Sequence, residues 1–358
     1  MKRKVYLLTG SIVFSLMLTG CFQGEQSSQN QETEQPQDAE AVDNLEGATS
    51  EEAEEVNKEG AEEAAEMVPR ELYLLDKNGM VASQTIDLPQ LDSKEVAAQV
   101  LEYLVIDGPV TSVLPNGFQA VLPAGTEILG VNLKEDGTVI VDVSEEFKGY
   151  EASQEVKILE AITHTLTQFD NVKRVQLWIN GHPQEEMPVN GTPIGQGYTR
   201  TNGINVVETG AVDLIDSQPV TMYYPAEHNE SRYYIPVTQY VETSEDNVYQ
   251  SIVQALMDGP GYQTNVVHVF NENALLTEEP TINDGVLEMV FNQGILMDEE
   301  KAVIADEVME TLVRTLTEQE GVKAVDIKVE NVEQLVSENG EAYTEPVTKQ
   351  TYLPSEKL

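Results

Sequence analysis

Apolar positions follow the same order twice along this chain. Residues 71–182 can be placed over residues 221–330 at an offset of about 150, and the apolar positions then coincide from one end to the other. Each copy has a strand pattern, an amphipathic helix, two alternating segments, a longer helix and a closing alternating segment. The repeat predicts two domains of one fold, which agrees with a length of 358 residues.

The turns of the first copy predict how its strands pair. Asn78-Gly79 and Asp136-Gly137 each separate two strand-like segments, and such two-residue turns are typical of antiparallel hairpins. A longer helix is expected from Ser153, followed by a strand over residues 174–179. Strands with one apolar face and two amphipathic helices predict an α+β fold, with two tandem two-layer repeats in which helices cover one side of a mixed sheet.

A helix-ending signal occurs once in each copy and is the clearest signature of the repeat. The residues are Asp107, Gly108 and Pro109 in the first copy and Asp258, Gly259 and Pro260 in the second. Each glycine is expected in the left-handed conformation after the last turn, and each proline cannot continue a helix. Asp92 and Thr243 are expected to cap the two helices. We interpret the signature as structural, with a binding role for its aspartate as the open alternative.

The amino terminus resembles the export signal of a bacterial lipoprotein. Three basic residues precede an apolar run of 14 residues, Val5 to Leu18, which is shorter than the roughly 20 needed to cross a bilayer. Leu18, Thr19 and Gly20 then precede Cys21 like a lipobox. The resemblance predicts cleavage after residue 20 and a diacylglyceryl group on Cys21, and two acyl chains suffice for stable anchoring. An uncleaved membrane anchor is the alternative, and both place the rest of the chain outside the cytoplasm.

An acidic segment follows the cysteine. Residues 22–68 contain 15 acidic residues, one lysine and no apolar periodicity. Such a segment cannot bury enough apolar surface to offset the entropy of ordering. The predicted organisation is therefore a signal peptide (1–20), an acidic disordered tether (21–68), a first domain (69–190), a Gly- and Pro-rich connection (191–218) and a second domain (219–358).

Charge and cysteine content exclude several classes of function. The formal net charge of −43 argues against nucleic-acid binding and against direct attraction to anionic lipid. Cys21 is the only cysteine, so disulfides, cysteine-ligated metals and a cysteine nucleophile are all excluded. Membrane contact is expected only through the lipid.

Candidate chemistry is sparse. The four histidines have no metal-binding spacing and no serine nucleophile motif occurs in the folded part, so no metal, cofactor or catalytic residue is predicted. His164, in a predicted helix, is interpreted as a satisfied structural residue. Asp142, Glu145 and Glu146 are the acidic cluster of first interest, interpreted as a solvated strand end with calcium binding or catalysis as alternatives.

Four tyrosines suggest an alternative function. Tyr223, Tyr224, Tyr233 and Tyr234 could form a sugar-binding platform, which would make the chain a peptidoglycan-binding or peptidoglycan-hydrolysing lipoprotein. A half-buried strand is the favoured interpretation of these residues. A solute-binding lipoprotein is a third reading, weakened because no lobes of parallel sheet are predicted.

The order of motifs resembles the GerM family of sporulation and germination lipoproteins of Bacillus-type bacteria. The resemblance rests on the lipobox, the acidic tether, the two Asp-Gly-Pro signatures, Leu122-Pro123-Ala124-Gly125-Thr126 and Val141-Asp142-Val143-Ser144. It implies two GerM-type domains similar to the ring-building modules of secretion systems. It also implies a non-catalytic role at the mother-cell membrane facing the forespore, where the protein would help the SpoIIIA and SpoIIQ channel complex to assemble, with self-assembly left open. No catalytic residues follow from the family.

Overall fold

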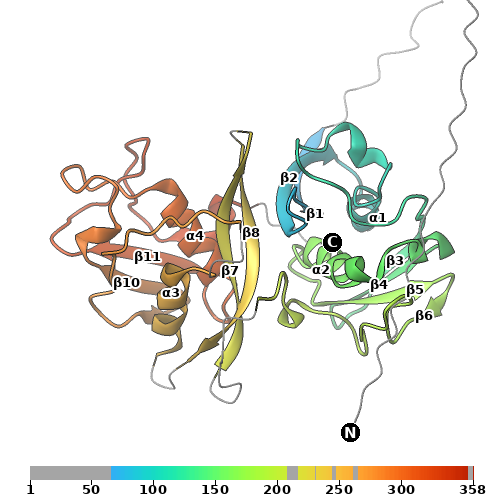
Figure 1. Cartoon of the computed structure of the whole chain (residues 1–358). Helices are drawn as coiled ribbons and strands as arrows, with labels where there is room; N and C mark the ends of the chain where they lie inside the picture. Colours follow the sequence, from blue (N-terminus) through green and yellow to red (C-terminus); the bar gives the residue numbers. More distant parts are fainter. Residues whose placement is uncertain (1–65, 208–216, 230, 244–246, 261–264, 354–357) are drawn as a thin grey trace, which may run out of the picture. The chain divides into compact units, whose positions relative to one another are not determined.

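The computed structural model describes residues 66–207, 217–229, 231–243, 247–260, 265–353 and 358. The predicted signal peptide, the lipobox with Cys21 and nearly all of the tether lie outside the described residues. The elements of the first repeat (Figure 1) are β1 (Met67–Leu75), β2 (Val81–Pro89), α1 (Ser93–Glu102), β3 (Ile128–Leu133), β4 (Thr138–Val143), α2 (Glu155–Leu166), β5 (Arg174–Ile179) and β6 (His182–Pro183).

The second repeat has the same elements in the same order. They are β7 (Ser217–His228), β8 (Ser231–Glu242), α3 (Val248–Asp258), β9 (Thr281–Asn283), β10 (Val286–Phe291), α4 (Asp306–Leu316), β11 (Ala324–Val329) and β12 (Val347–Thr348). The predicted α+β repeat is confirmed.

Each repeat contains a mixed four-stranded sheet. In the first, β3 pairs antiparallel with β4, and β4 pairs parallel with β5. The second repeats this pattern with β9, β10 and β11. Parallel neighbours need a crossover, which α2 and α4 provide. The tail strand β12 pairs antiparallel with β11.

The two hairpins form a third sheet that neither repeat contains alone. Its strand order is β1-β2-β8-β7, and the only register pair between β2 and β8 is Ser83 with Tyr234. Helix α2 contacts both β1 and β5, and α4 contacts both β7 and β11, so each long helix lies between the hairpin sheet and the mixed sheet of its own repeat. The two repeats thus share one sheet.

Asn205 belongs to the connection between the repeats. On one side of the Ser83–Tyr234 pair, its side chain makes the hydrogen bonds between β2 and β8 that main-chain groups would otherwise make. Its Oδ1 accepts the Val81 N–H at 2.9 Å, and its Nδ2 donates to the carbonyls of Val81 (2.6 Å) and Pro236 (2.8 Å). Its φ of 47° lies in the left-handed region, which asparagine tolerates better than most residues. The side-chain amide therefore bridges the two hairpins as a peptide group would.

Neighbouring residues of the connection pair with β8. Thr238 donates its N–H to the Ile204 carbonyl at 2.9 Å and accepts the Val207 N–H at 3.0 Å. Ile204 is buried, whereas Val206 is 50% exposed. This part of the connection is a structural element, not a free linker.

The Asp-Gly-Pro signature has different geometry in the two repeats. Helix α3 ends at Asp258, and Gly259 has the expected left-handed φ of 80°. Helix α1 already ends at Glu102, Asp107 is the left-handed residue (φ 60°), and Gly108 is extended (φ −81°). A Cβ on Gly108 would lie 2.9 Å from the Val105 carbonyl oxygen and 3.0 Å from that of Glu102. Close backbone approach, and not left-handed geometry, explains this glycine.

Of the two expected helix caps, one lies at the predicted residue and the other is wrong. Asp92 precedes α1 as predicted, although its side chain makes no capping hydrogen bond. Helix α3 is capped by Asn247, which accepts the Gln250 N–H at 3.2 Å, because the chain continues past Thr243 before the helix begins. Helix α2, expected from Ser153, begins at Glu155 after a 3-10 turn over Ala152–Gln154.

Gly108→Ala should destabilise the protein by about 1–3 kcal/mol, because the new methyl group overlaps two carbonyl oxygens that cannot move without distorting the turn. Urea unfolding should show a lower midpoint at an unchanged m-value. Gly130→Ala is the control, since its Cβ would meet nothing within 4 Å. Equal midpoints for the two variants would contradict this account of Gly108.

Asn205→Ala should lower the free energy of unfolding by about 1–3 kcal/mol, because it leaves main-chain groups of Val81 and Pro236 without partners. Asn229→Ala is the matched control, since Asn229 also has a positive φ (50°) but lies in an exposed turn. A loss no greater than that of the control would show that the side-chain bridge contributes nothing.

Candidate functional site

The junction of the two repeats holds a partly buried ionic cluster, whose side chains are 15–31% exposed. Glu318 accepts hydrogen bonds from Arg200 Nη1 at 3.1 Å and from Lys349 Nζ. Burial alone would raise the pKa of Glu318, but Arg200 and Lys349 outweigh it and hold that pKa well below its usual range. The cluster therefore keeps one carboxylate charged between two cations.

The cations come from equivalent positions in the two repeats. Arg200 lies in a 3-10 turn (Arg200–Asn202) after Tyr198, which bridges β5, and Lys349 lies in one (Lys349–Thr351) after β12, which pairs with β11. We did not predict this cluster. The sequence feature that could have indicated it is that Arg200 and Lys349 are basic residues at equivalent positions of the two repeats, in a chain with only 20 basic residues.

Two equivalent tyrosines meet beside the ionic cluster. The hydroxyls of Tyr73 and Tyr223 lie 3.4 Å apart. Each donates its main-chain N–H at 3.0 Å to a threonine of its own long helix, Tyr73 to Thr165 and Tyr223 to Thr315. Burial raises the pKa of both phenols, so they remain neutral here. The repeats thus contact each other through corresponding residues.

His164 is buried but not satisfied. Its ring packs against that of Tyr73 with 5.2 Å between centroids, and neither ring nitrogen has a hydrogen-bond partner among the described residues. Burial, with Arg200 nearby, lowers its pKa and keeps the imidazole neutral. His164 is therefore a core residue, as predicted, but its ring lacks the hydrogen bonds expected of a satisfied histidine among the described residues.

The acidic cluster at the end of β4 does not converge. Asp142 accepts the N–H of Gly181 at 2.9 Å, and Glu145 forms an ion pair with Lys148 at 2.6 Å. A hydrogen bond from Ser144 lowers the pKa of the exposed Glu146. Each carboxylate has its own partner, which is the geometry of a solvated strand end.

The four tyrosines proposed as a sugar platform are buried in β7 and β8. Tyr233, for example, donates its hydroxyl to Asp76 at 3.0 Å and packs edge-on against Phe118. Both partners belong to the first repeat, so this side chain serves the junction. The tyrosines offer no open aromatic surface, and even the expectation of a half-buried strand underestimates their burial.

The described residues contain no cluster of three or more side chains suited to a metal ion. Within the same residues, no helix is both long enough and apolar enough to span a bilayer. Asp76 accepts the N–H groups of Asn78 (2.8 Å) and Met80 (2.9 Å), so its carboxylate closes the turn between β1 and β2.

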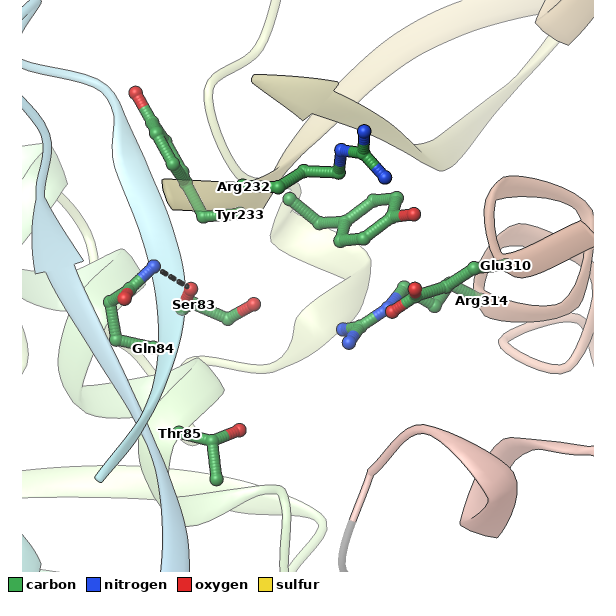
Figure 2. Close-up of a pocket in the computed structure, with 8 residues that line it drawn as sticks. Ser83, Gln84, Thr85, Arg232, Tyr233, Glu310 and Arg314 are labelled. Atoms are coloured by element: carbon green, nitrogen blue, oxygen red, sulfur yellow. Dashed lines mark hydrogen bonds and ion pairs between the residues drawn. The ribbon is translucent and has the colours of Figure 1, made fainter. Parts of the chain in front are cut away.

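A pocket of about 300 Å³ opens where β2 and β8 separate. Figure 2 shows its walls, which come from β2 of the first repeat and from β8 and α4 of the second. The lining residues are Ser83, Gln84, Thr85, Arg232, Tyr233, Tyr234, Glu310 and Arg314. Glu310 is the one carboxylate among these lining residues, and Arg232 and Arg314 are the cations.

Comparison with known proteins matches both repeats. The sequence model of a family described as "Germane: Sporulation and spore germination" matches residues 71–185 and 221–335. The spore germination protein GerM of Bacillus subtilis is 43% identical over 346 residues, which cover 94% of this chain and 93% of that protein.

Solved structures agree with the sequence comparison. The tandem GerMN domains of the sporulation protein GerM from Bacillus subtilis are 44% identical and have a TM-score of 0.74, with 82% of this chain and all of that chain covered. The first GerMN domain of the same protein is 55% identical over 37% of this chain and 98% of its own, with a TM-score of 0.35. This chain belongs to the GerM family of sporulation and spore germination proteins and carries two GerMN domains in tandem.

Proposed function

We propose that this chain is a non-catalytic, lipid-anchored assembly factor for sporulation. It would support the SpoIIIA and SpoIIQ channel complex between mother cell and forespore and act again in germination. The main support is the similarity to a spore germination protein over 94% of this chain, which includes both repeats.

The distribution of polar groups favours assembly over catalysis. The ionic cluster of Arg200, Glu318 and Lys349 is partly buried at the junction, where its charges pair with one another. The acids at the end of β4 are dispersed among separate partners. Residues arranged in this way hold two repeats in a fixed relation, which suits a rigid body that presents surfaces to other proteins.

Anchoring would come from the amino terminus. The apolar run before Cys21 and the three basic residues that precede it support export and lipid attachment. The chain as a whole has a formal net charge of −43 and would be repelled by anionic lipid, so the acidic tether would keep the folded part away from the surface of its own membrane.

Peptidoglycan binding or hydrolysis remains the second candidate, because an extracytoplasmic acidic protein has access to the cell wall. Only the acids at the end of β4 favour it, since Asp142 and Glu145 lie on neighbouring segments of one strand end. Burial of the tyrosines removes its other support.

Cys21→Ala should move the protein from the membrane fraction to the soluble fraction of sporulating cells, because the sulfur that would carry the lipid is absent. The urea midpoint of the purified chain should be unchanged. Gln23→Ala, two residues away, serves as the control and should stay in the membrane fraction. Normal membrane association of Cys21→Ala would rule out lipid anchoring at this residue.

Isolation of the full chain from sporulating cells should recover proteins of the forespore channel, and incubation with muropeptides or sacculi should release no product. Product release that Asp142→Ala or Glu145→Ala abolishes, and that the control Asp326→Ala retains, would replace assembly by wall hydrolysis. A protein with neither channel partners nor turnover would contradict both functions.

A further inference from the structure

The pocket between β2 and β8 contains a buried arginine with unused donor capacity. The Arg314 side chain is only 9% exposed, and its Nε donates to Glu310 Oε1 at 2.6 Å. Its Nη1 forms an ion pair with Glu71 Oε1 at 3.7 Å, which is too long for a hydrogen bond, and neither atom has a hydrogen-bond partner among the described residues. A guanidinium has five N–H donors, and leaving one buried without an acceptor is costly.

Polar groups of the opposite wall face this arginine. Figure 2 shows Ser83 and Thr85 of β2 on one side of the pocket and Arg314 and Glu310 of α4 on the other. Along a β-strand, the N–H and C=O groups of successive residues point to opposite sides. In β2, the N–H and C=O groups of Val81 point towards Asn205, on the side away from β1. Those of Thr85, four residues on, therefore point to the same open side. The pocket is lined by hydrogen-bond donors from two directions.

Two arginines and one glutamate line the pocket, in a chain of 63 acidic and 20 basic residues. The carboxylates of Glu307 and Glu71, which are not among the lining residues, also form ion pairs with these arginines. Arg232 is 53% exposed and forms an ion pair with Glu307. The Tyr234 ring stacks on the Arg314 guanidinium at 4.6 Å and fixes its plane. A held, planar guanidinium is suited to a planar acceptor with two oxygens.

We propose that this pocket binds a carboxylate group. Arg314 would donate to the carboxylate oxygens, the hydroxyls of Ser83 and Thr85 would complete its hydrogen bonds, and Arg232 would attract it to the entrance. Glu310 on the same wall disfavours a dianion such as phosphate. A volume of about 300 Å³ is at the lower end for small-molecule sites, which suits a short carboxylic acid or the end of a peptide.

Isothermal titration of the full chain with N-acetylglycine tests the proposal, with N-acetylglycinamide as the uncharged control. We expect one saturable site with a Kd of about 1 mM, as suits eight non-hydrogen atoms, and no binding of the amide. Equal heats from the acid and the amide, no saturation, or equally tight binding of inorganic phosphate would overturn it.

Variants locate the binding to this pocket. Arg314→Gln should abolish it, but this buried residue is also ion-paired, so Thr85→Val and Ser83→Ala are tested in parallel. Each should weaken binding about fivefold, as expected for one lost hydrogen bond. Lys301→Gln, which removes an exposed and distant charge, should leave Kd unchanged. Unchanged binding in Thr85→Val and Ser83→Ala would place the acid elsewhere and overturn the proposal.

A second titration distinguishes the sources of the carboxylate. Acetyl-triglycine with a free carboxyl terminus is compared with N-acetylglycine, and its amidated form is the control. Tighter binding of the peptide acid identifies the end of a polypeptide, whereas equal affinity identifies a small free acid. The titrations do not require channel proteins or lipid, so their outcome is separate from that of the assembly proposal.

Discussion

The structure depends on how the open edges of two β-hairpins are satisfied. Buried main-chain N–H and C=O groups need partners, and an unpaired edge invites association with other chains. Each hairpin has one edge covered by its own long helix: Thr165 and Gln168 of the α2 region accept the N–H groups of Tyr73 and Glu71 in β1. The other edges, those of β2 and β8, face each other. Where these two strands do not pair directly, residues 204–207 lie between them and make the hydrogen bonds. Because the connection completes the sheet, separating the repeats would expose β2, β8 and the connection together.

The two repeats share their apolar positions, but they differ in charge at the positions that meet at the junction. Glu318 stands where the first repeat has Gln168, and Arg314 stands where it has His164. If both repeats had Glu at this position, two carboxylates would approach each other at the junction, and each negative charge would disfavour ionisation of the other carboxyl group. With Gln168 bonded to the Glu71 main chain, Glu318 alone takes both Arg200 and Lys349. These side chains are only partly buried, and the net gain from such ion pairs is small, so the cluster serves chiefly to fix how the repeats meet.

Sequence patterns predict the repeat, its strands and its helices because apolar periodicity reports which face of an element is buried. They do not report which strand edges meet, so the pairing of β2 with β8 and the bridging role of Asn205 could not be inferred. Gly108 illustrates a second limit. Its turn signal is clear from the sequence, but the reason for glycine is the approach of carbonyl oxygens of Glu102 and Val105, which depends on where α1 ends. Candidate sites were harder still, since Arg314 and Thr85 are more than 200 residues apart and share a pocket only through the shared sheet.

The remaining strand edges show why the pocket differs from its surroundings. Prolines 69, 219 and 225 lie on the outer edges of β1 and β7 and remove N–H groups there. Strand β3 has an irregular register between Ile128 and Gly130, and β6, β9 and β12 are two or three residues long. Short, bulged or proline-containing edges discourage pairing with another chain. The segment of β2 beyond Ser83 has none of these features until Pro89; instead it faces a space with a buried guanidinium on its far wall. An edge left open beside unused donors is better suited to receiving an acceptor than to being closed by the fold itself.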